Sequence, residues 1–351
     1  MRDVAVVSFA QSRSVARDAL RNEVEILMPV VTEAIDCAGI DRKKIGFTCS
    51  GSSDYLAGVA FSFVTSLDAV GAWPPIEESH VEMDAAWALY EAWVRLQHGD
   101  IDSALVYGFG KSSLGDLPEV LSRQLDPYTV GPLWPDATSL AAIQARAMLD
   151  AGTCTERQMA EVAVRSLADA RANPNAQRGG DDTVETLLAR PYVCAPLREH
   201  DCAPVSDGAS AIVLAAGDLA RSLCKRPAWI RGIDHRIDGQ YIGTRDLLSA
   251  PSARLAAEKA GAKRDKIDVA ELHAPYTHQE LLLREGMALG HSVRLNPSGG
   301  ALGAHPVMAA GLIRIGEAAA RVHDGSADRA LAHATSGPWL QQNLVCVLEG
   351  D

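Results

Sequence analysis

The sequence lacks the features that mark several specialised classes of protein. Aromatic residues make up only 5% of its 351 residues, and charged residues make up 22% against 47% hydrophobic ones. This composition excludes a disordered chain, a collagen and a small disulfide-rich protein. Few aromatics combined with abundant alanine and glycine favour helices packed closely on sheets over an all-β sandwich. At this length we expect about two domains, or one large duplicated domain.

Positive charge is also scarce. The sequence has 33 lysines and arginines against 45 aspartates and glutamates, which gives a formal net charge of −12. Its densest basic run, Arg42-Lys43-Lys44, is too short for a surface that follows nucleic-acid phosphates. We therefore expect no nucleic-acid partner. With no signal peptide and no apolar run long enough to cross a bilayer, we expect a cytoplasmic protein without a membrane span.

The sequence has no C-x-x-C pair, and its seven cysteines are scattered. An odd, scattered set is typical of reduced thiols in a cytoplasmic protein rather than of a disulfide framework or a zinc site. We therefore expect no metal site. The seven are Cys37, Cys49, Cys154, Cys194, Cys202, Cys224 and Cys346.

The most informative positive feature is an internal repeat. Residues 34–45 read AIDCAGIDRKKI and residues 256–267 read AAEKAGAKRDKI, with matching alanines, glycines and basic residues. A second pair follows in the same order, HGDIDSALV at 98–106 and HDGSADRALA at 323–332. The repeat predicts an N-terminal half at residues 1–110 and a C-terminal half at 211–351. Residues 111–210 are predicted to hold an inserted loop domain and the return to the first sheet.

Each half alternates strands with helices, which predicts a layered α/β architecture. The third helix of each half, at about 85–97 and 307–322, is apolar nearly all round and is therefore predicted to be buried. Two such helices between two sheets give a duplicated five-layered α-β-α-β-α fold. The proline-rich segment between the halves is expected to cover a binding site.

Four phrases carry a family resemblance. They are NPNAQ at 173–177, CAPVSDGASAI at 202–212, ELHAPYTHQE at 271–280 and NPSGGALGAHPVMAAG at 296–311. In this order and spacing they resemble the thiolase superfamily, especially the thiolases related to sterol carrier proteins. HVEMDAAWALYEA and AHATSGPWLQQN further resemble the thiolase-like lipid-transfer proteins of sterol side-chain degradation. The resemblance covers nearly the whole chain and implies the same five-layered thiolase fold.

The two places where this family carries cysteines hold other residues. The nucleophile's place, where a short strand enters the first buried helix, reads HVEMDA at 80–85, and Glu82 is nearest to it. No cysteine lies between Cys49 and Cys154. The place of the second cysteine, in a Cys-x-Gly phrase, reads TSGPW at 335–339. We therefore expect no acyl-enzyme intermediate on a cysteine.

The resemblance implies that His273 and His305 polarise a thioester carbonyl and stabilise an enolate. Tyr276 replaces the family's phenylalanine and is a further candidate. Glu82 and Asp84, at the start of the buried helix, are candidate bases. The structural alternatives are that Asp84 only caps the helix and that Glu82 pairs with an arginine. Residues implied in substrate or CoA binding are Asn296, Gly299, Gly300, Ser336, Gly337 and Trp339.

The leading hypothesis is a carbon–carbon lyase that cleaves a 3-hydroxyacyl-CoA by retro-aldol chemistry, with a steroid side chain as the implied acyl group. It needs a CoA thioester as substrate but no bound cofactor. The alternatives are a non-catalytic thiolase-like subunit and an atypical acyltransferase that uses Ser336 or a carboxylate as nucleophile.

The resemblance also implies an assembly. The chain is expected to form a homodimer, or a heteromer with a second thiolase-like chain or an OB-fold zinc-ribbon protein. Residues 51–55 are expected near the dimer interface.

Overall fold

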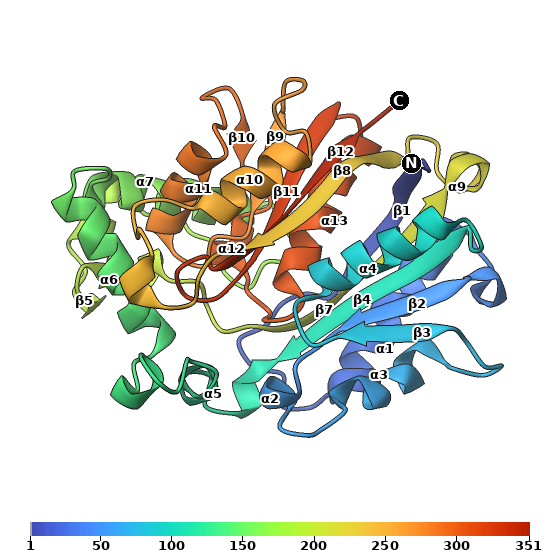
Figure 1. Ribbon diagram of the computed structural model, residues 1–351, viewed down its shortest axis with the longest axis horizontal. Helices are drawn as coiled ribbons and strands as arrows, with labels where there is room; N and C mark the ends of the chain where they lie inside the picture. The colour runs from blue at the N-terminus through green and yellow to red at the C-terminus, as the bar shows by residue number, and fades with distance from the viewer. Residues whose placement is uncertain (1) are drawn as a thin grey trace.

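The computed structural model describes residues 2–351 (Figure 1). Ten strands form one sheet in the order β10-β9-β11-β12-β8-β1-β7-β4-β2-β3. The N-terminal half contributes β1 (Val4–Gln11), β2 (Phe47–Gly51), β3 (Glu78–Val81), β4 (Ser103–Lys111) and β7 (Asp207–Ala216). The C-terminal half contributes β8 (Ala228–Ile237), β9 (Val269–Leu272), β10 (Arg294–Leu295), β11 (Arg329–Ser336) and β12 (Gln342–Glu349).

The strand order confirms the duplication. In the first half, β2 pairs in parallel with β3 and β4, whereas β7 pairs antiparallel with β4 and β1. In the second half, β9 pairs in parallel with β10 and β11, and β12 pairs antiparallel with β11 and β8. Within the sheet, the two five-stranded halves join where β1 pairs with β8, through Ala5 with Trp229 and Val6 with Ala228.

The helices complete the predicted five layers. α4 (Ala85–His98) packs on β2 and β4, α13 (Ala310–His323) packs on β11 and β9, and the two helices touch each other. α1 (Glu23–Ala38) and α3 (Ser62–Val70) cover the outer face of the first half, and α10 (Pro251–Lys259) and α11 (Thr277–Gly286) cover that of the second. The middle layer holds the largest apolar cluster, to which both helices contribute. α13 is buried on nearly every side, as predicted, whereas the later turns of α4 reach the surface.

Between β4 and β7 the chain leaves the sheet. This excursion holds α5 (Leu117–Arg123), α6 (Ala137–Asp150), α7 (Glu156–Ala170), α8 (Val184–Leu188) and a small hairpin of β5 (Tyr192–Cys194) and β6 (Leu197–Arg198). In Figure 1, α6, α7 and β5 lie to the left of α11, and α5 lies lower, near α2. The returning strand β7 spans residue 210, where we placed the end of the inserted segment. The division into three segments stays a prediction.

Left-handed backbone angles set two helix boundaries. Gly58 and Phe61 both adopt such angles between α2 (Asp54–Ala57) and α3, so the chain forms two short helices there. The second buried helix was expected from residue 307, but α13 begins at Ala310, because Met308 has a φ of 76°. α9 (Gly217–Leu223) and α12 (Gly300–Gly303) are short connections.

The close approach of β4 to the segment before α13 gives a stability prediction. A Cβ added at Gly110 would overlap the backbone of Val307. We expect Gly110→Ala to lower the free energy of unfolding by about 1–3 kcal/mol, because neither backbone segment can give way inside the packed middle layer. Urea unfolding measures this. Gly290→Ala is the control, since a Cβ there would meet no atom within 4 Å, and an equal loss in both variants would contradict the argument.

Candidate active site

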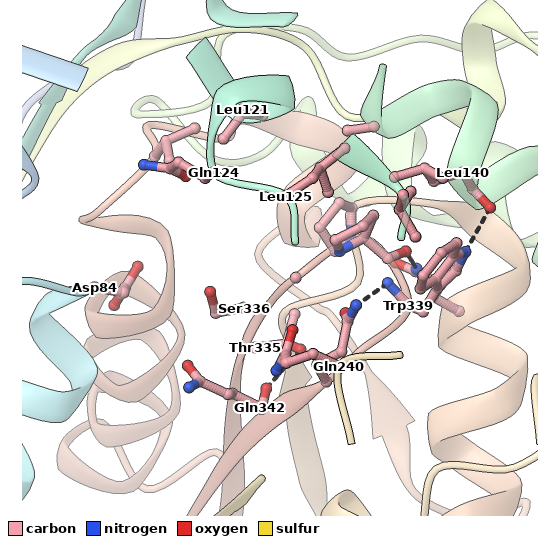
Figure 2. A pocket seen from close by; sticks show the side chains of 18 of the residues that line it. Asp84, Leu121, Gln124, Leu125, Leu140, Gln240, Thr335, Ser336, Trp339 and Gln342 are labelled. Atoms are coloured by element: carbon pink, nitrogen blue, oxygen red, sulfur yellow. Dashed lines mark hydrogen bonds between the residues drawn. The ribbon is translucent and has the colours of Figure 1, made fainter. Parts of the chain in front are cut away.

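A cavity of about 720 Å³ opens beside the buried middle layer (Figure 2). Its walls come from the loop after β9, the loop between β11 and β12, and the segments that lead into α4 and α13. The inserted segment closes it through residues between 121 and 140. In Figure 2, Asp84 lies on one side and Trp339 on the other, with Thr335 and Ser336 between them.

Two histidines meet at this cavity. His273 follows the end of β9, and His305 lies in the loop between α12 and α13. Their Nε2 atoms are 2.9 Å apart, so one ring donates a hydrogen bond to the other. His273 Nδ1 accepts the backbone N–H of Thr335 at 3.3 Å, which assigns the His273 proton to Nε2. His273 is therefore the donor and His305 Nε2 the acceptor in this bond.

Both rings are held uncharged. Burial, with a smaller contribution from the positive charge of Arg314, lowers the pKa of His305 to about 4. Burial also holds the pKa of His273 well below its usual value, with smaller contributions from His305, His333 and Arg314. Near neutral pH the site therefore contains two neutral imidazoles that bind hydrogen-bond donors and acceptors without a net charge.

Asp84 joins the two buried helices. Its Oδ1 accepts the N–H groups of Ala86 at 2.8 Å and Leu312 at 3.1 Å, and its Oδ2 accepts that of Gly311 at 2.8 Å. The carboxylate thus caps α4, as the structural alternative supposed, and binds the first turn of α13 as well. It also lines the cavity. Burial raises its pKa, although the three N–H groups oppose that shift.

Glu82 does not lie in the cavity. Its side chain is exposed, and Oε1 accepts the N–H of Asp54 at 2.7 Å at the start of α2. β3 ends at Val81, and the following turn directs Glu82 outward. Asp84, two residues further on, is the carboxylate that lines the cavity.

All seven cysteines lie within residues 2–351, and none of them lines the cavity. Burial raises the pKa of Cys49 and of Cys202 to about 12, and that of Cys154 to about 11. Their thiols are therefore protonated near neutral pH and poor nucleophiles. Cys346 is fully buried within β12. The geometry agrees with the expected absence of a sulfur nucleophile.

Tyr276 lines the cavity from the N-terminal end of α11. Its hydroxyl lies 3.4 Å from Thr138 Oγ1 of the inserted segment. Burial raises its pKa, so the phenol stays neutral and acts as a hydrogen-bond group only.

Asn296, Gly299 and Gly300 do not line the cavity, contrary to the sequence-based expectation. Asn296 Oδ1 accepts the N–H of Leu272 at 2.6 Å, which ties the loop to β9 instead. Gly299 has a φ of 95° and packs against Ala170 of α7. These residues shape the loop that leads to His305.

Ser336, Gly337 and Trp339 do lie at the cavity, in the loop between β11 and β12. Trp339 Nε1–H donates to the carbonyl oxygen of Leu140 at 2.7 Å, which fastens the inserted segment to this loop. No hydrogen-bond partner is recorded for the Ser336 hydroxyl within the described chain, so it is free to contact a ligand.

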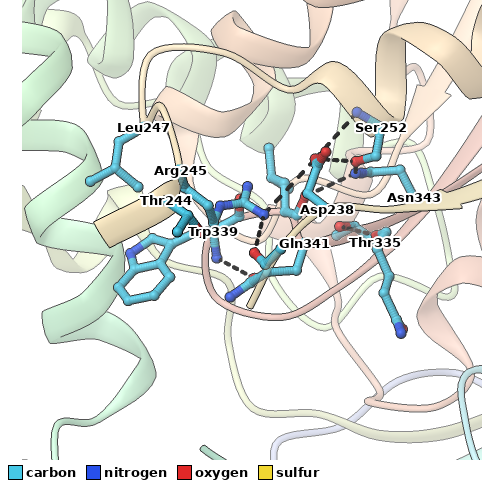
Figure 3. A network of polar contacts seen from close by, with 12 residues as sticks. Asp238, Thr244, Arg245, Leu247, Ser252, Thr335, Trp339, Gln341 and Asn343 are labelled. Carbon is cyan, nitrogen blue, oxygen red and sulfur yellow. Dashed lines mark hydrogen bonds and ion pairs between the residues drawn. The ribbon is translucent and has the colours of Figure 1, made fainter. Parts of the chain in front are cut away.

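A network of polar contacts holds the loop between β11 and β12 in place (Figure 3). Arg245 Nη2 donates to the carbonyl oxygen of Trp339 at 2.8 Å, and Asp238 Oδ2 lies 3.9 Å from the same guanidinium. Gln341 Oε1 accepts the N–H of Trp339 at 2.9 Å. Asp238 in turn accepts the N–H of Ser252 at 3.2 Å. The loop is therefore fixed before any ligand binds.

Several residues that line the cavity were not among the predicted site residues. Gln124, Gln240 and Gln342 place amide groups at the wall, and Leu125 and Leu140 add apolar surface. The four-residue spacing of leucines at 117, 121 and 125 was the one available signal, since it predicts a single helical face. No motif marks the glutamines.

Within residues 2–351, no helix is both long and apolar enough to cross a membrane, and no group of three potential ligands is placed to hold a metal ion.

Known proteins resemble the chain in sequence. No family model matches it. An acetyl-CoA acetyltransferase of Methanocaldococcus jannaschii is 26% identical over 349 residues, which cover 90% of this chain and 89% of that protein. Sterol carrier protein 2 of Gallus gallus is 25% identical over 294 residues, or 70% of this chain and 53% of that protein.

Solved structures resemble it in fold. An Ltp2-ChsH2(DUF35) aldolase superposes with a TM-score of 0.80 at 20% identity, covering 99% of this chain and 98% of that one. Human mitochondrial 3-ketoacyl-CoA thiolase superposes with a TM-score of 0.79 at 16% identity, covering 99% of both chains. The chain therefore has a thiolase fold along its length, and in sequence it is similar to an acetyl-CoA acetyltransferase and to sterol carrier protein 2.

Proposed function

We propose that this chain of thiolase fold is a carbon–carbon lyase that cleaves a 3-hydroxyacyl-CoA by a retro-aldol reaction. One observation carries the proposal: two neutral histidines and a buried carboxylate share a cavity that no cysteine lines. This set stabilises an enolate and accepts a proton, but it offers no sulfur for an acyl-enzyme.

The histidine pair serves as the oxyanion site. A thioester oxygen placed beside both Nε2 atoms receives the N–H of His273 directly. It receives a second N–H once His305 adopts its Nε2-protonated form, since His305 no longer has to accept from His273. Both rings are neutral, so they stabilise the developing enolate charge without protonating it prematurely.

Asp84 is the base in this scheme. Its Oδ2 accepts a single backbone N–H, from Gly311, which leaves a lone pair for a substrate hydroxyl. Asp84 takes the β-hydroxyl proton, the β-oxygen forms a carbonyl, and the Cα–Cβ bond breaks with its electron pair passing into the thioester enolate. Protonation of Cα then gives a shortened acyl-CoA and a ketone or aldehyde. Burial raises the pKa of Asp84, which makes it a stronger base than an exposed aspartate.

The cavity supports a bulky apolar acyl group. Leu121, Leu125, Val130, Leu140 and Trp339 form one continuous apolar wall. The similarity to sterol carrier protein 2 and the motifs of the sequence agree with a steroid side chain as that acyl group.

A partner chain forms part of the proposal. The aldolase with the same fold combines Ltp2 with ChsH2, a DUF35 chain. We propose a DUF35-type or second thiolase-like partner, or a second copy of this chain. Large apolar side chains around the predicted interface at residues 51–55 are exposed: Tyr55 to 59%, Phe61 to 69% and Trp73 to 86%.

The test is cleavage in the absence of free CoA. The chain, alone and with the partner encoded beside it, receives a steroid 3-hydroxyacyl-CoA, and the released ketone or aldehyde is measured. We expect product without added CoA, because retro-aldol cleavage consumes none. Dependence on free CoA would instead indicate thiolysis. Turnover that survives both Asp84→Asn and His305→Ala would leave the chain as a non-catalytic subunit.

Acyl transfer is the second candidate, because a similar protein is named as an acetyl-CoA acetyltransferase. Such transfer needs a nucleophile at the cavity, and Ser336 offers a hydroxyl there, within the TSGPW phrase that stands where the family carries its second cysteine. Ser336→Ala distinguishes the two reactions: retro-aldol cleavage is expected to persist, whereas transfer through Ser336 would stop.

A further inference from the structure

A buried junction beside the histidine pair has no part in the chemistry proposed above. At its centre is Ser298, in the loop between β10 and α12. Its N–H and hydroxyl both donate to the carboxylate of Glu271, at 3.0 and 2.7 Å, and its carbonyl oxygen accepts from Asn173 at 3.0 Å. The N–H, the hydroxyl and the carbonyl oxygen of this serine therefore all form hydrogen bonds within the protein.

Arg314 completes the junction from the buried helix α13. Its Nη1 donates to Glu271 Oε2 at 2.7 Å and to Ser298 Oγ at 2.6 Å. Glu271 is fully buried, and Arg314 is only 3% exposed. Because removing one partner would strand the other charge away from water, this ion pair resists separation.

The junction reaches both histidines along the backbone. Glu271 is the residue two before His273, so both side chains leave β9 on the face that meets α13. Ser298 begins the short path through α12 to His305. The His305 N–H is fixed separately, by Ser206 Oγ at 2.9 Å.

We propose that Arg314 is a positioning residue of the histidine pair: through Glu271 and Ser298 it holds the two segments that carry His273 and His305. Burial is the main reason that both rings resist protonation, and the positive charge of Arg314 adds to it. The inference rests on the proposed function for its role in catalysis. Its effect on the histidines themselves does not depend on which reaction the site performs.

The charges around the pair favour this assignment. Besides Arg314 on α13, the titratable groups at the pair are His333 on β11, Asp84 before α4 and Tyr276 before α11. Of these, Arg314 is the one permanent cation. Its field opposes a second positive charge on either ring, and the pKa values of both His273 and His305 are lowered by it.

The experiment compares Arg314→Lys with Arg314→Met by ¹⁵N NMR titration of the histidine rings. Arg314→Lys keeps the charge and is expected to leave the titration of both rings and the Nε2–H signal of His273 unchanged. Arg314→Met removes the positive charge beside the pair, so we expect the pKa of both rings to rise above that in the parent protein. Arg329→Met is the matched control, since Arg329 is a buried arginine paired with Glu349 at the far end of β11.

Should Arg314→Met fail to fold, the double variant Glu271→Gln/Arg314→Met decides instead. It replaces the ion pair by neutral side chains of similar length, so no buried charge is stranded. A folded variant of either kind whose histidines titrate as in the parent protein would overturn the inference. A shift equal to that of Arg329→Met would overturn it as well.

Kinetics separate this inference from the proposed function. If the retro-aldol reaction is correct, Arg314→Met lowers kcat with little change in KM, and Arg314→Lys restores it. If no retro-aldol turnover is found in any variant, the NMR titration still measures whether Arg314 sets the state of the pair.

Discussion

His273→Ala is expected to lower kcat for carbon–carbon cleavage by about 100- to 1,000-fold, the usual effect of losing one donor to an oxyanion. In the proposed reaction His273 donates to the thioester oxygen from Nε2, because Nδ1 already accepts the N–H of Thr335. KM is expected to change little, since the lost hydrogen bond strengthens only as the enolate forms. Steady-state kinetics with the steroid 3-hydroxyacyl-CoA measure both constants.

The pair should also behave as a unit. His305→Ala is expected to cost a similar factor, and the double variant about as much as either single one, because each ring orients the other through the 2.9 Å bond. His291→Ala is the control, since His291 is an exposed histidine bonded to Arg284 on the surface. A kcat within about threefold of the parent in both single variants would contradict the oxyanion role.

The fold could be predicted from the sequence because the repeated residues have the same local structural role in both halves. Gly39 and Gly261, the matched glycines of the repeat, both adopt left-handed angles, at φ 66° and 82°, where their helices end. A helix end of this kind favours glycine wherever it occurs. The two halves therefore carry glycine at the same place because each has the same helix end there. His273 and His305 were found because they lie in motifs that span strand ends.

The rest of the site depends on contacts between distant segments, which a linear pattern does not record. Asp84 rather than Glu82 faces the cavity because α13 donates two N–H groups to it, and that helix lies more than 200 residues further along the chain. The cavity wall formed by Leu125 and Leu140 depends on the inserted segment docking through Trp339. Asn296 has cavity-like chemistry but is used internally, by β9 and Glu280.

Acid is expected to destabilise the fold well above the pH at which carboxylates are protonated. His278 and His333 are completely buried, and burial lowers their pKa values to about 3 and about 4. In the unfolded chain both titrate near 6.5. The unfolded state therefore binds more protons than the native state between pH 6.5 and about 4, and stability falls as the pH drops through that window.

Each of these two histidines should remove about 2 kcal/mol of stability between pH 7.5 and pH 5. Asp84 and Glu271 act in the opposite direction, because burial raises their pKa values and the native state takes up protons first. Carboxylates with lowered pKa values, such as Asp18 and Asp268, lose their contribution only at lower pH. Urea unfolding at both pH values measures the net change. A stability that is constant from pH 7.5 to 5 would contradict buried neutral histidines.

Substitution of single histidines separates charge from hydrogen bonding. Neither ring nitrogen of His278 has a hydrogen-bond partner among the described residues, so His278→Leu removes a buried polar group that gains nothing from the fold. We expect it to stabilise the protein by about 1 kcal/mol at pH 7.5 and by about 3 kcal/mol at pH 5. His333→Leu is the matched comparison, because His333 Nε2 bonds Asn343 Oδ1 at 2.8 Å. It should flatten the pH dependence equally but destabilise at pH 7.5, since it leaves the Oδ1 atom of Asn343 without its donor in the core. Equal effects of both variants at pH 7.5 would mean that the hydrogen bond of His333 contributes nothing, and unchanged pH dependence in both would place the acid sensitivity elsewhere.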